Sequence, residues 1–378
     1  MNSADKDGAE TEGIPAVMVI AEAGVNHNGD LDRAIELVDA AAESGADVVK
    51  FQTFLAEEEI SRDAPKAAYQ LMATEVGESQ FEMVKNLELS PTAHEALIDK
   101  CRRKNIRFLS SPFDIPSILL LADRLGLKTL KIPSGEMTHA PFLFEAARTG
   151  CDLIVSTGMS TLDEIRDALS IITLGFTHSD GKPSLEAARD VYGDGKNQDV
   201  LRKKVSLLQC TTEYPAPFED ANLKAMDTLR EMFGLAVGYS DHTPDTVIAI
   251  AAAARGACII EKHLTLDRRL PGPDHKASLE PDPFARMVKS IRAVEQALGD
   301  GLKKPAPSEQ HNIPIARKSL VAKRPIKAGD LFTPETLAVK RPGTGISPME
   351  YWRLLDKPSR RHYALDEIVH LDEINDAE

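Results

Sequence analysis

Residues 238–243 read Gly-Tyr-Ser-Asp-His-Thr, and residues 259–264 read Ile-Ile-Glu-Lys-His-Leu. Both runs lie in segments rich in β-forming residues, 235–242 and 258–266, and an amphipathic segment at 245–255 separates them. A strand, a helix and a second strand at this spacing predict a βαβ unit, in which the two strands are parallel neighbours in one sheet.

The same alternation of strand and helix fills most of the chain. Six further strand candidates precede this unit, at residues 17–24, 48–54, 107–113, 129–135, 153–159 and 205–214. The other helical segments lie at residues 31–44, 91–104, 116–125, 141–149, 162–173, 222–233 and 283–298. Eight strand-then-helix units predict an α/β fold of the (β/α)8 TIM barrel type, in preference to a doubly wound open sheet.

One segment inside the barrel does not fit this pattern. Residues 175–204 are polar and rich in Gly, Asp and Lys, and they separate the fifth helix from the sixth strand. We expect a surface insertion here that is helical only around residues 184–191.

The regions outside the barrel differ from it in composition. Residues 1–14 are polar and acidic and predict a disordered tail before a catalytic barrel at 15–298. Residues 299–314, rich in Pro and charge, predict a linker. The closing segment, 315–378, has short runs broken by Gly and Pro and predicts a small β-rich domain. About 60 residues are near the lower limit for an independent core, so this domain should lean on another surface.

Charge and cysteine usage exclude several classes of protein. The net charge is −14, which argues against a nucleic-acid binder, so an anionic substrate would need locally placed Lys, Arg or backbone N–H groups. The four cysteines have no CxxC spacing and predict reduced thiols in a cytoplasmic protein. No apolar run is long enough to cross a bilayer and no signal peptide is evident, so we expect no membrane partner.

The two histidines of the quoted runs predict a metal site. Glu261 and His263 are two positions apart on a strand, so they share one face and Lys262 points to the other. If the preceding strand is the neighbour in the sheet, His242 can join them. Two imidazoles, a carboxylate and open positions for water are typical of a catalytic metal site. The alternative is a pair of neutral histidines that are hydrogen-bonded in the core.

Lysines and hydroxyls at the strand ends predict an anion site. In a TIM barrel the active site lies at the carboxyl ends of the strands. Lys50 and Lys131 lie in otherwise apolar strands, where an unpaired charge is costly. They could form a cage for a phosphate and a carboxylate with four serines, or pair with glutamates as structural ions. The serines are Ser111, Ser134, Ser156 and Ser240.

Three other polar residues near strand ends are weaker candidates. His27 lies in an Asn-His-Asn-Gly turn and is either a structural residue or a substrate contact. Cys210 has no local His and carboxylate partners, which favours a small buried residue over a nucleophile. Glu213 can be a solvated residue at the rim.

These residues occur in short motifs whose order resembles that of a known family. The motifs are IAEAGVNHNG, VKFQTF, SSPFD, KIPSGE, STGM, CTTEYPAPFED, GYSDHT, IIEKH and PGPDH, followed by ARKSLVA and KRPGTGISPMEY. Together they resemble the sialic acid (nonulosonic acid) synthases, including the antifreeze-like (SAF) domain at the C-terminus. The resemblance covers about residues 15 to 375.

The resemblance implies an enzyme that condenses phosphoenolpyruvate with an open-chain N-acetylmannosamine-type sugar and releases phosphate. It assigns His242 and His263 to a divalent metal, with Mn²⁺ expected and Mg²⁺ or Co²⁺ as alternatives. Glu22 and Glu261 match the acid/base carboxylates. The remaining matches are phosphoenolpyruvate-binding (Lys50, Ser111, Lys131, Ser134, Ser156, Ser240) and sugar-binding (Gln52, Tyr214, Asp274, Arg341) residues.

The resemblance also implies a homodimer in which the SAF domain is swapped onto the partner's barrel. Arg341, by itself an ordinary surface arginine, would then reach the neighbouring site and contact the acylamino group. The product would enter surface polysaccharide biosynthesis.

The identity of the sugar is left open between two substrates. The expected product is an N-acetylneuraminate-type acid. The alternative is an N,N'-diacetyllegionaminate synthase that uses 2,4-diacetamido-2,4,6-trideoxymannose, since Thr211-Thr212 replaces an Asn of some N-acetylmannosamine users. More distant alternatives are a metal-dependent barrel aldolase or epimerase, and a carbohydrate-binding module without catalysis.

Overall fold

The computed structural model describes residues 17–66, 79–177 and 182–374. The chain divides into two compact units, Met1–Gly299 and Asp300–Glu378, and each is described by itself. The tail predicted at residues 1–14 lies outside the described residues.

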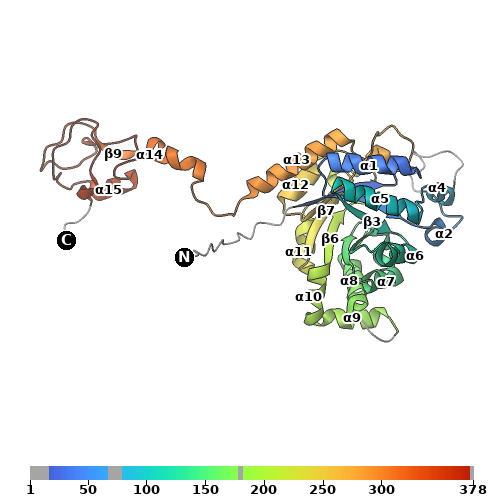
Figure 1. The fold of residues 1–378 in the computed structure, drawn as a ribbon. Helices are drawn as coiled ribbons and strands as arrows, with labels where there is room; N and C mark the ends of the chain where they lie inside the picture. Colours follow the sequence, from blue (N-terminus) through green and yellow to red (C-terminus); the bar gives the residue numbers. More distant parts are fainter. Residues whose placement is uncertain (1–16, 67–78, 178–181, 375–378) are drawn as a thin grey trace, which may run out of the picture. The chain divides into compact units, whose positions relative to one another are not determined.

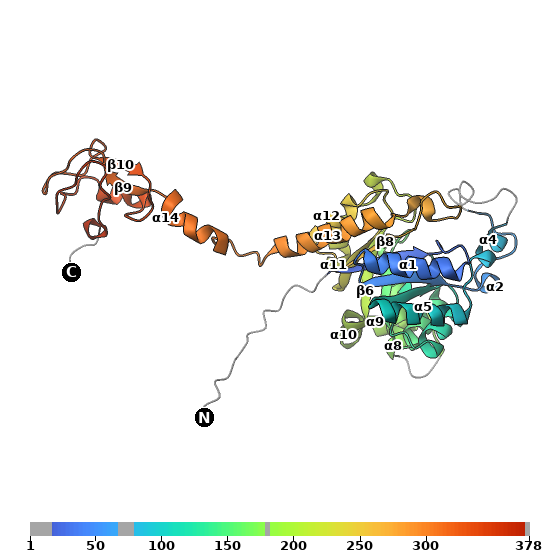
Figure 2. The same cartoon turned by 45° about the horizontal axis from the view of Figure 1, so that its top comes forward.

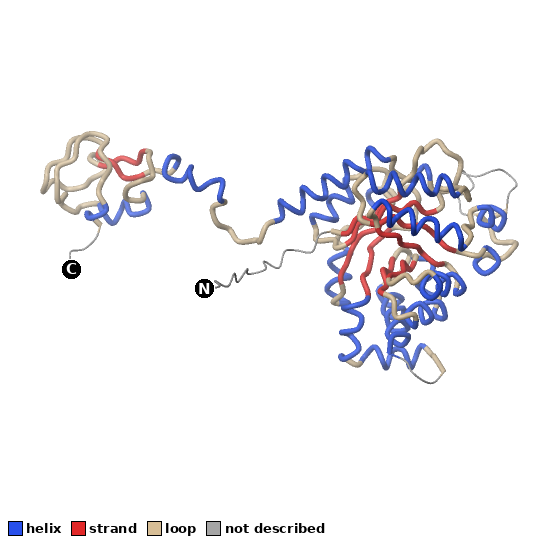
Figure 3. The backbone as a smooth tube through the Cα atoms, viewed as in Figure 1, coloured by secondary structure: helices blue, strands red, loops and turns tan. Residues whose placement is uncertain are grey.

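Eight parallel strands form the centre of the first unit, with helices on the outside (Figures 1 and 3). The sheet order is β3-β2-β1-β8-β7-β6-β5-β4, so β3 and β4 close the barrel without a hydrogen-bonded ladder between them among the described residues. This near-closed (β/α)8 barrel confirms the predicted fold class. The strands are β1 (Met18–Gly24), β2 (Val48–Thr53), β3 (Arg107–Pro112), β4 (Thr129–Ile132), β5 (Asp152–Ser156), β6 (Val205–Cys210), β7 (Ala236–Asp241) and β8 (Ile259–His263).

One helical layer surrounds these strands. Figure 2 shows α13, α1 and α5 side by side on the outside of the barrel, in agreement with their mutual packing. The layer consists of α1 (Leu31–Glu43), α5 (Pro91–Lys104), α6 (Ile115–Leu119) continued by η1 (Leu120–Arg124), α7 (Ala140–Arg148), α8 (Leu162–Thr177), α11 (Ala225–Phe233), α12 (Val247–Ala254) and α13 (Pro281–Leu298). Shorter helices lie in the strand-to-helix connections: α2 (Ala56–Glu59), α4 (Gln80–Asn86), η2 (Ser134–Thr138), η3 (Phe218–Asp220) and η4 (His275–Ala277).

A layer of apolar side chains fills the barrel interior beneath the strand ends. Six strands contribute one buried residue each, namely Ile20, Val48, Leu109, Ile154, Leu208 and Ile259. Each of these lies two positions before a polar or thiol residue, and residues two apart on a strand share a face. The polar residues Glu22, Lys50, Ser111, Ser156, Cys210 and Glu261 therefore stand directly above an apolar floor.

The segment predicted as a partly helical surface insertion is helical over most of its length, which corrects the sequence interpretation. Helix α8 continues through Gly175 to Thr177, and α9 (Leu185–Gly193) and α10 (Gly195–Lys204) follow. Gly175, the first residue of the predicted insertion, lies inside α8, and a Cβ there would lie 2.6 Å from Ala147 Cβ and 2.7 Å from Phe144 O. The glycine thus permits close packing of α8 against α7. Ser184 and Asp194 cap the two following helices.

The second unit is a small domain with a two-stranded antiparallel sheet of β9 (Ser319–Ala322) and β10 (Leu337–Lys340). Its core contains nine buried residues, among them Leu320, Phe332 and Tyr363. The other elements are η5 (Pro307–Asn312), α14 (Ile313–Ala316), η6 (Pro348–Glu350), α15 (Tyr351–Leu354) and η7 (Leu371–Glu373). In the described part of the chain, no helix is both long and apolar enough to span a bilayer.

Candidate active site

A cavity of about 270 Å³ opens at the carboxyl ends of the barrel strands. Every site residue that the sequence predicts within the first unit lines it. These are Glu22, Lys50, Gln52, Ser111, Lys131, Ser134, Ser156, Tyr214, Ser240, His242, Glu261, His263 and Asp274. They come from loops and strands far apart in the sequence, and barrel closure brings them together.

Two lysines and two glutamates form a connected cluster at the bottom of this cavity. Lys50 Nζ lies 2.6 Å from Glu22 Oε2 and 3.7 Å from Glu261 Oε2. Lys131 Nζ lies 3.4 Å from Glu261 Oε1. All four side chains are at most 5% exposed, so each charge depends on its partners rather than on water.

The pKa values of these groups reflect burial opposed by the neighbouring charges. Burial alone would raise the pKa of Glu261, but Lys131 and Lys50 outweigh it and lower this pKa to about 2. Burial lowers the pKa of Lys50, but Glu22 and Glu261 outweigh it and the pKa is raised. At Glu22 burial prevails over Lys50 and raises the pKa. Burial also prevails at Lys131 and lowers its pKa, despite Glu261. Glu261 is therefore firmly ionised, whereas Glu22 is the carboxyl more easily protonated.

The four predicted serines lie around this cluster. Lys50 Nζ donates to Ser111 Oγ at 3.0 Å, and Ser240 Oγ donates to Glu261 Oε1 at 2.9 Å. Ser134 Oγ accepts from the backbone N–H of Gly158 at 3.0 Å. Ser156 Oγ is buried and has no hydrogen-bond partner among the described residues. An unpartnered buried hydroxyl is costly, so Ser156 is ready to bond a ligand in the cavity.

The two histidines approach each other above the cluster, with ring centroids 5.5 Å apart. His242 Nδ1 lies 2.6 Å from the carbonyl oxygen of Thr211, so this nitrogen carries the proton and Nε2 carries a lone pair. His263 Nδ1 is buried without a hydrogen-bond partner among the described residues. Burial lowers the pKa of His242 to about 4 and that of His263 well below its usual value. Both rings are thus neutral and can offer a lone pair.

The two imidazole rings could serve as the two protein ligands of a metal ion. No group of three His, Cys, Asp or Glu side chains among the described residues is arranged to hold a metal. The carboxylate expected beside the histidines, Glu261, instead faces Lys50, Lys131 and Ser240. The neutral imidazoles and the unpartnered His263 Nδ1 match the donor set of a divalent ion, with the other positions left to water or substrate.

Three of the predicted sugar-binding residues form the wall around the histidines. The Tyr214 ring centroid lies 4.3 Å from that of His242 and 5.6 Å from that of His263. Gln52 Nε2 donates to Glu22 Oε1 at 3.1 Å. Asp274 Oδ2 lies 3.9 Å from His263 Nδ1, and burial together with Glu22 raises the pKa of Asp274 to about 7.

Arg341, the fourth predicted sugar-binding residue, belongs to the second unit. It is exposed, and its Nε donates to the carbonyl oxygen of Ala316 at 3.0 Å. Its contact with a neighbouring subunit stays a prediction.

The structure favours the structural interpretation of His27. This residue is fully buried, and its Nδ1 accepts from the backbone N–H of Gly29 within its own turn. Its ring packs on Phe51 at a centroid distance of 6.1 Å. Cys210 is buried and 3.2 Å from Ser134 Oγ, and burial raises the pKa of its thiol, which does not suit a nucleophile.

One side of the cavity is an apolar wall that was not predicted from the sequence. Val25, Phe54, Met83, Val84 and Leu87 form a buried cluster and also line the cavity. Three of them come from α4 or its C-cap, a helix that was not predicted. Its signal in the sequence is the capping box of Ser79 and Glu82, which the structure shows with both hydrogen bonds formed.

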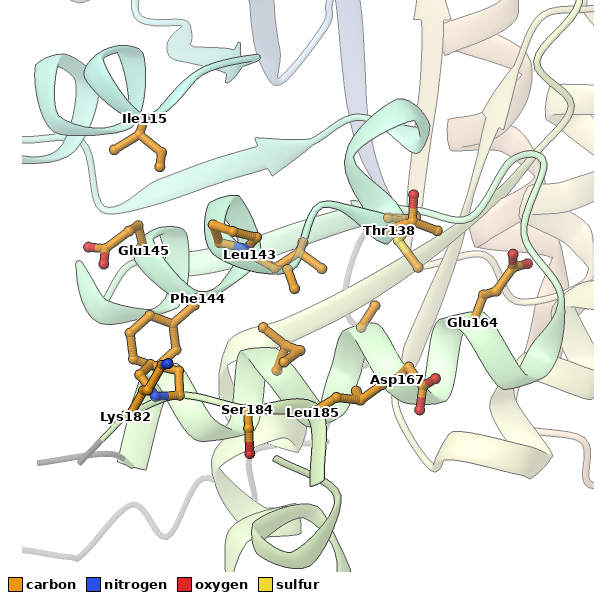
Figure 4. A pocket seen from close by; sticks show the side chains of 16 residues that line it. Ile115, Thr138, Leu143, Phe144, Glu145, Glu164, Asp167, Lys182, Ser184 and Leu185 are labelled. Atoms are coloured by element: carbon orange, nitrogen blue, oxygen red, sulfur yellow. The ribbon is translucent and has the colours of Figure 1, made fainter. Parts of the chain in front are cut away.

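A second, larger cavity of about 550 Å³ lies away from these polar groups, between α7, α8 and residues 182–185 (Figure 4). Apolar side chains such as Leu143, Phe144 and Leu185 form most of its lining. It contains neither the lysines nor the histidines, so we place the chemistry in the smaller cavity.

Comparison with known proteins identifies similarities along both units. The profile of the NeuB family matches residues 37–303, and that of the SAF domain matches residues 317–373.

Individual relatives match along nearly their whole length. An N,N'-diacetyllegionaminic acid synthase of Campylobacter jejuni is 49% identical, covering 93% of this chain and 98% of its own. A second protein of this name, from Legionella pneumophila, is 45% identical over 88% of this chain and 87% of its own. Among solved structures, an N-acetylneuraminic acid (sialic acid) synthetase of Leptospira borgpetersenii in complex with citrate matches with a TM-score of 0.64 and 33% identity. The match covers 79% of this chain and 90% of that one.

Proposed function

Because this chain belongs to the NeuB family and carries a SAF domain, we propose that it is an N,N'-diacetyllegionaminic acid synthase. Membership of this family makes it a phosphoenolpyruvate-condensing transferase of the nonulosonic acid class. The proposed reaction joins phosphoenolpyruvate to open-chain 2,4-diacetamido-2,4,6-trideoxymannose and releases phosphate.

The choice of sugar departs from the first expectation of the sequence analysis. The N-acetylmannosamine-type sugar was the main interpretation, and the diacetamido 6-deoxy sugar was its alternative. The two legionaminic acid synthases, at 49% and 45% identity, favour the alternative.

One structural observation supports this choice most directly, namely the apolar wall of the cavity. Val25, Phe54, Met83, Val84 and Leu87 offer only hydrocarbon and thioether surface. A 6-deoxy sugar with two acetamido groups carries three methyl groups, which would gain by leaving water against such a wall. N-acetylmannosamine would bring a hydroxymethyl group there instead, and its hydroxyl would lose water without finding an acceptor in the wall.

We assign phosphoenolpyruvate to the lysine side of the cavity. Lys50 and Lys131 would bind its phosphate and carboxylate, with hydroxyls from Ser111, Ser134, Ser156 and Ser240. The unpartnered Ser156 Oγ supports this assignment, because a ligand oxygen would satisfy it. The new negative charge would also weaken the hold of both lysines on Glu261, so the basicity of that carboxylate rises when substrate binds.

The two carboxylates then suit different proton transfers. C3 of the enol phosphate attacks the aldehyde carbon, and the aldehyde oxygen takes a proton, which Glu22 can supply because its pKa is raised. Water adds at C2 and loses a proton to Glu261, which is ionised before substrate arrives. The bond between C2 and the phosphate oxygen then breaks, and phosphate leaves with the electron pair. The C2 hydroxyl gives its proton to Glu22 as the C2 carbonyl forms, which restores the protonated carboxyl.

We also propose that His242 and His263 hold a divalent ion, with Mn²⁺ preferred and Mg²⁺ or Co²⁺ as alternatives. When bound, such an ion supplies Lewis-acid polarisation of the sugar aldehyde. Tyr214, Gln52 and Asp274 surround the place where that aldehyde would lie and would orient the sugar.

A phosphate-release assay with two sugars tests the proposed function. With phosphoenolpyruvate and Mn²⁺ present, we expect kcat/KM for the diacetamido 6-deoxy sugar to exceed that for N-acetylmannosamine by about 10- to 100-fold. This is the range in which an apolar pocket discriminates by one small group. Lys131→Met should lose activity with both sugars, and chelation should abolish activity reversibly.

Four outcomes would contradict parts of this proposal. Equal or faster release with N-acetylmannosamine would overturn the sugar assignment, and full activity after chelation would overturn the metal. Turnover of the sugar without phosphate release would favour the aldolase or epimerase alternative, and binding without any turnover would favour a carbohydrate-binding module.

Three further parts of the proposal concern the whole protein. We propose a homodimer in which the SAF domain of one subunit, through Arg341, completes the site of the other. We also propose a reducing, cytoplasmic location, which the four free cysteines support. The pathway would be the biosynthesis of surface polysaccharide.

A further inference from the structure

A second ion pair lies on the outer face of the two strands that carry the histidines. Lys262 Nζ is 2.8 Å from Asp241 Oδ2, and both side chains are fully buried. Asp241 immediately precedes His242, and Lys262 lies between Glu261 and His263. Because side chains alternate along a strand, this pair points into the helical layer while Glu261 and His263 point into the barrel.

The ammonium group of Lys262 has its full set of hydrogen-bond acceptors. Besides Asp241, it donates to the carbonyl oxygen of Thr243 at 2.5 Å and to that of Asp245 at 2.8 Å. Asp241 Oδ1 accepts from the backbone N–H of Thr243 at 3.0 Å and from its hydroxyl at 2.7 Å. One lysine thus ties β8 to the end of β7 and to the loop that follows His242.

This ion pair lies at the end of the ladder between β7 and β8. The ladder between β7 and β8 has Asp241 opposite Lys262 as its last registered pair, and His242 lies just beyond it. Beyond this pair, β8 no longer fixes the backbone at His242, whereas His263 stays paired with Glu22 on β1. The backbone N–H of Ala216 donates to the His242 carbonyl, but this contact does not join β7 to β8.

We propose that Lys262 and Asp241 are positioning residues that hold the two imidazoles at their mutual distance and orientation. Neither side chain is among those lining the cavity, so they would act only through His242 and His263. The inference rests on the proposed function in one respect, that the histidine pair binds the metal. Groups behind metal ligands typically change metal affinity by about 10- to 100-fold when removed.

The test uses a double variant, Lys262→Met with Asp241→Asn. A single substitution would leave one buried charge without its partner, at a cost of about 3–5 kcal/mol, and could prevent folding. The matched control is Arg292→Met with Asp47→Asn, which removes a pair 2.6 Å apart whose side chains do not line the cavity. Circular dichroism and thermal melting establish that both full-length variants are folded.

The first readout needs no metal. Nitrogen-15 NMR of the histidine rings reports the Nδ1-protonated tautomer of His242 that its bond to Thr211 imposes, and His242→Gln assigns the signal. We expect the wild type and the control to show this tautomer alone, and the double variant to show a mixture. An unchanged tautomer in the folded double variant would overturn the inference.

The second readout is the Kd for Mn²⁺ of the metal-free proteins. We expect binding about 10- to 100-fold weaker in the double variant and a change below about twofold in the control. Equal affinities in all three proteins, or an equal loss in the control, would also overturn the inference. If the wild type binds no Mn²⁺ at the histidines, the proposed metal is wrong, and the tautomer readout alone decides the positioning role.

Discussion

Two histidines beside the active-site cavity, His27 and His275, are buried without charge. Burial lowers the pKa of each to about 4, and the positive charge of Arg33 contributes to both shifts. His275 joins two loops, with Nδ1 2.6 Å from Thr265 Oγ1 and Nε2 3.2 Å from Asn28 Oδ1. Since a buried neutral histidine takes up a proton on unfolding at mildly acidic pH, these residues make stability depend on pH.

The pH dependence can be assigned to His27 by substitution. Its pKa is below that of the unfolded chain, so its contribution to stability is complete above about pH 6.5 and is lost as pH falls toward 4. The shift from 6.5 to about 4 corresponds to about 3 kcal/mol in the free energy of unfolding. We expect urea unfolding of His27→Gln to depend less on pH across this interval than that of the wild type. The exposed His311→Gln serves as control, and an equal slope in wild type and His27→Gln would contradict the assignment.

At the scale of single residues, the sequence predicted which side chains line the cavity. It predicted the contacts behind those side chains less completely. The spacing of Glu261 and His263 was sufficient to place both inside the barrel, because a strand has a fixed period of two. The same rule placed Lys262 on the outer face but could not give its partner, since Asp241 lies on another strand. It also suggested Glu261 as a metal ligand, whereas in the structure that carboxylate lies against Lys50, Lys131 and Ser240.

At the scale of the secondary-structure elements, two glycines have opposite roles. Gly238 lies in β7, where a Cβ would be 2.5 Å from the carbonyl oxygen of Ile259 on β8. Gly193 lies in α9, where a Cβ would meet nothing within 4 Å. The first glycine is required by close strand packing, and the second only costs conformational entropy.

Alanine substitution should therefore change stability in opposite directions at these two positions. We expect Gly238→Ala to lower the free energy of unfolding by about 1–3 kcal/mol, because the added methyl group overpacks the barrel. Gly193→Ala should raise it by about 0.5–1 kcal/mol, because alanine favours the helix and restricts the unfolded chain. Urea titrations of the two variants and the wild type measure both changes. A loss of stability in Gly193→Ala would contradict the packing described for α9.

The strands could be predicted from sequence more easily than their surroundings. Runs rich in Val, Ile and Leu predicted all eight strands, although several predictions continued into the polar loops where the ladders end. For β6, residues 205–214 were predicted, and the strand ends at Cys210. Between residues 175 and 204 the sequence predicted α9, as a helical stretch around residues 184–191, but the polar composition hid α10. Gly175 there serves a contact with α7 that only the tertiary structure reveals.

At the scale of the whole molecule, the proposed exchange of SAF domains can be tested by mixing inactive subunits. His263→Ala should inactivate a barrel, and Arg341→Ala should inactivate the domain that completes the partner's site. In a mixed dimer, the intact barrel of the Arg341→Ala subunit would receive Arg341 from the partner. We expect co-expression to restore roughly a quarter of the wild-type kcat, because random pairing makes half of the dimers mixed and each has one working site.

The control for this experiment is co-expression of His263→Ala with His242→Ala, in which no barrel is intact and no activity should return. Mass spectrometry would show whether mixed dimers of the His263→Ala and Arg341→Ala subunits form. If they form but stay inactive, the exchange of SAF domains is contradicted.

The buried cluster of Lys50, Lys131, Glu22 and Glu261 has a consequence for the living cell, where chloride and inorganic phosphate greatly outnumber any sugar precursor. Because the two ammonium groups are paired with carboxylates, the cavity exerts little net attraction on such ions. Under the proposed function, phosphoenolpyruvate would compete for both lysines because it offers a phosphate and a carboxylate together. Pairing of charges within the cavity would thus make the enzyme selective for a scarce dianionic substrate over abundant simple anions.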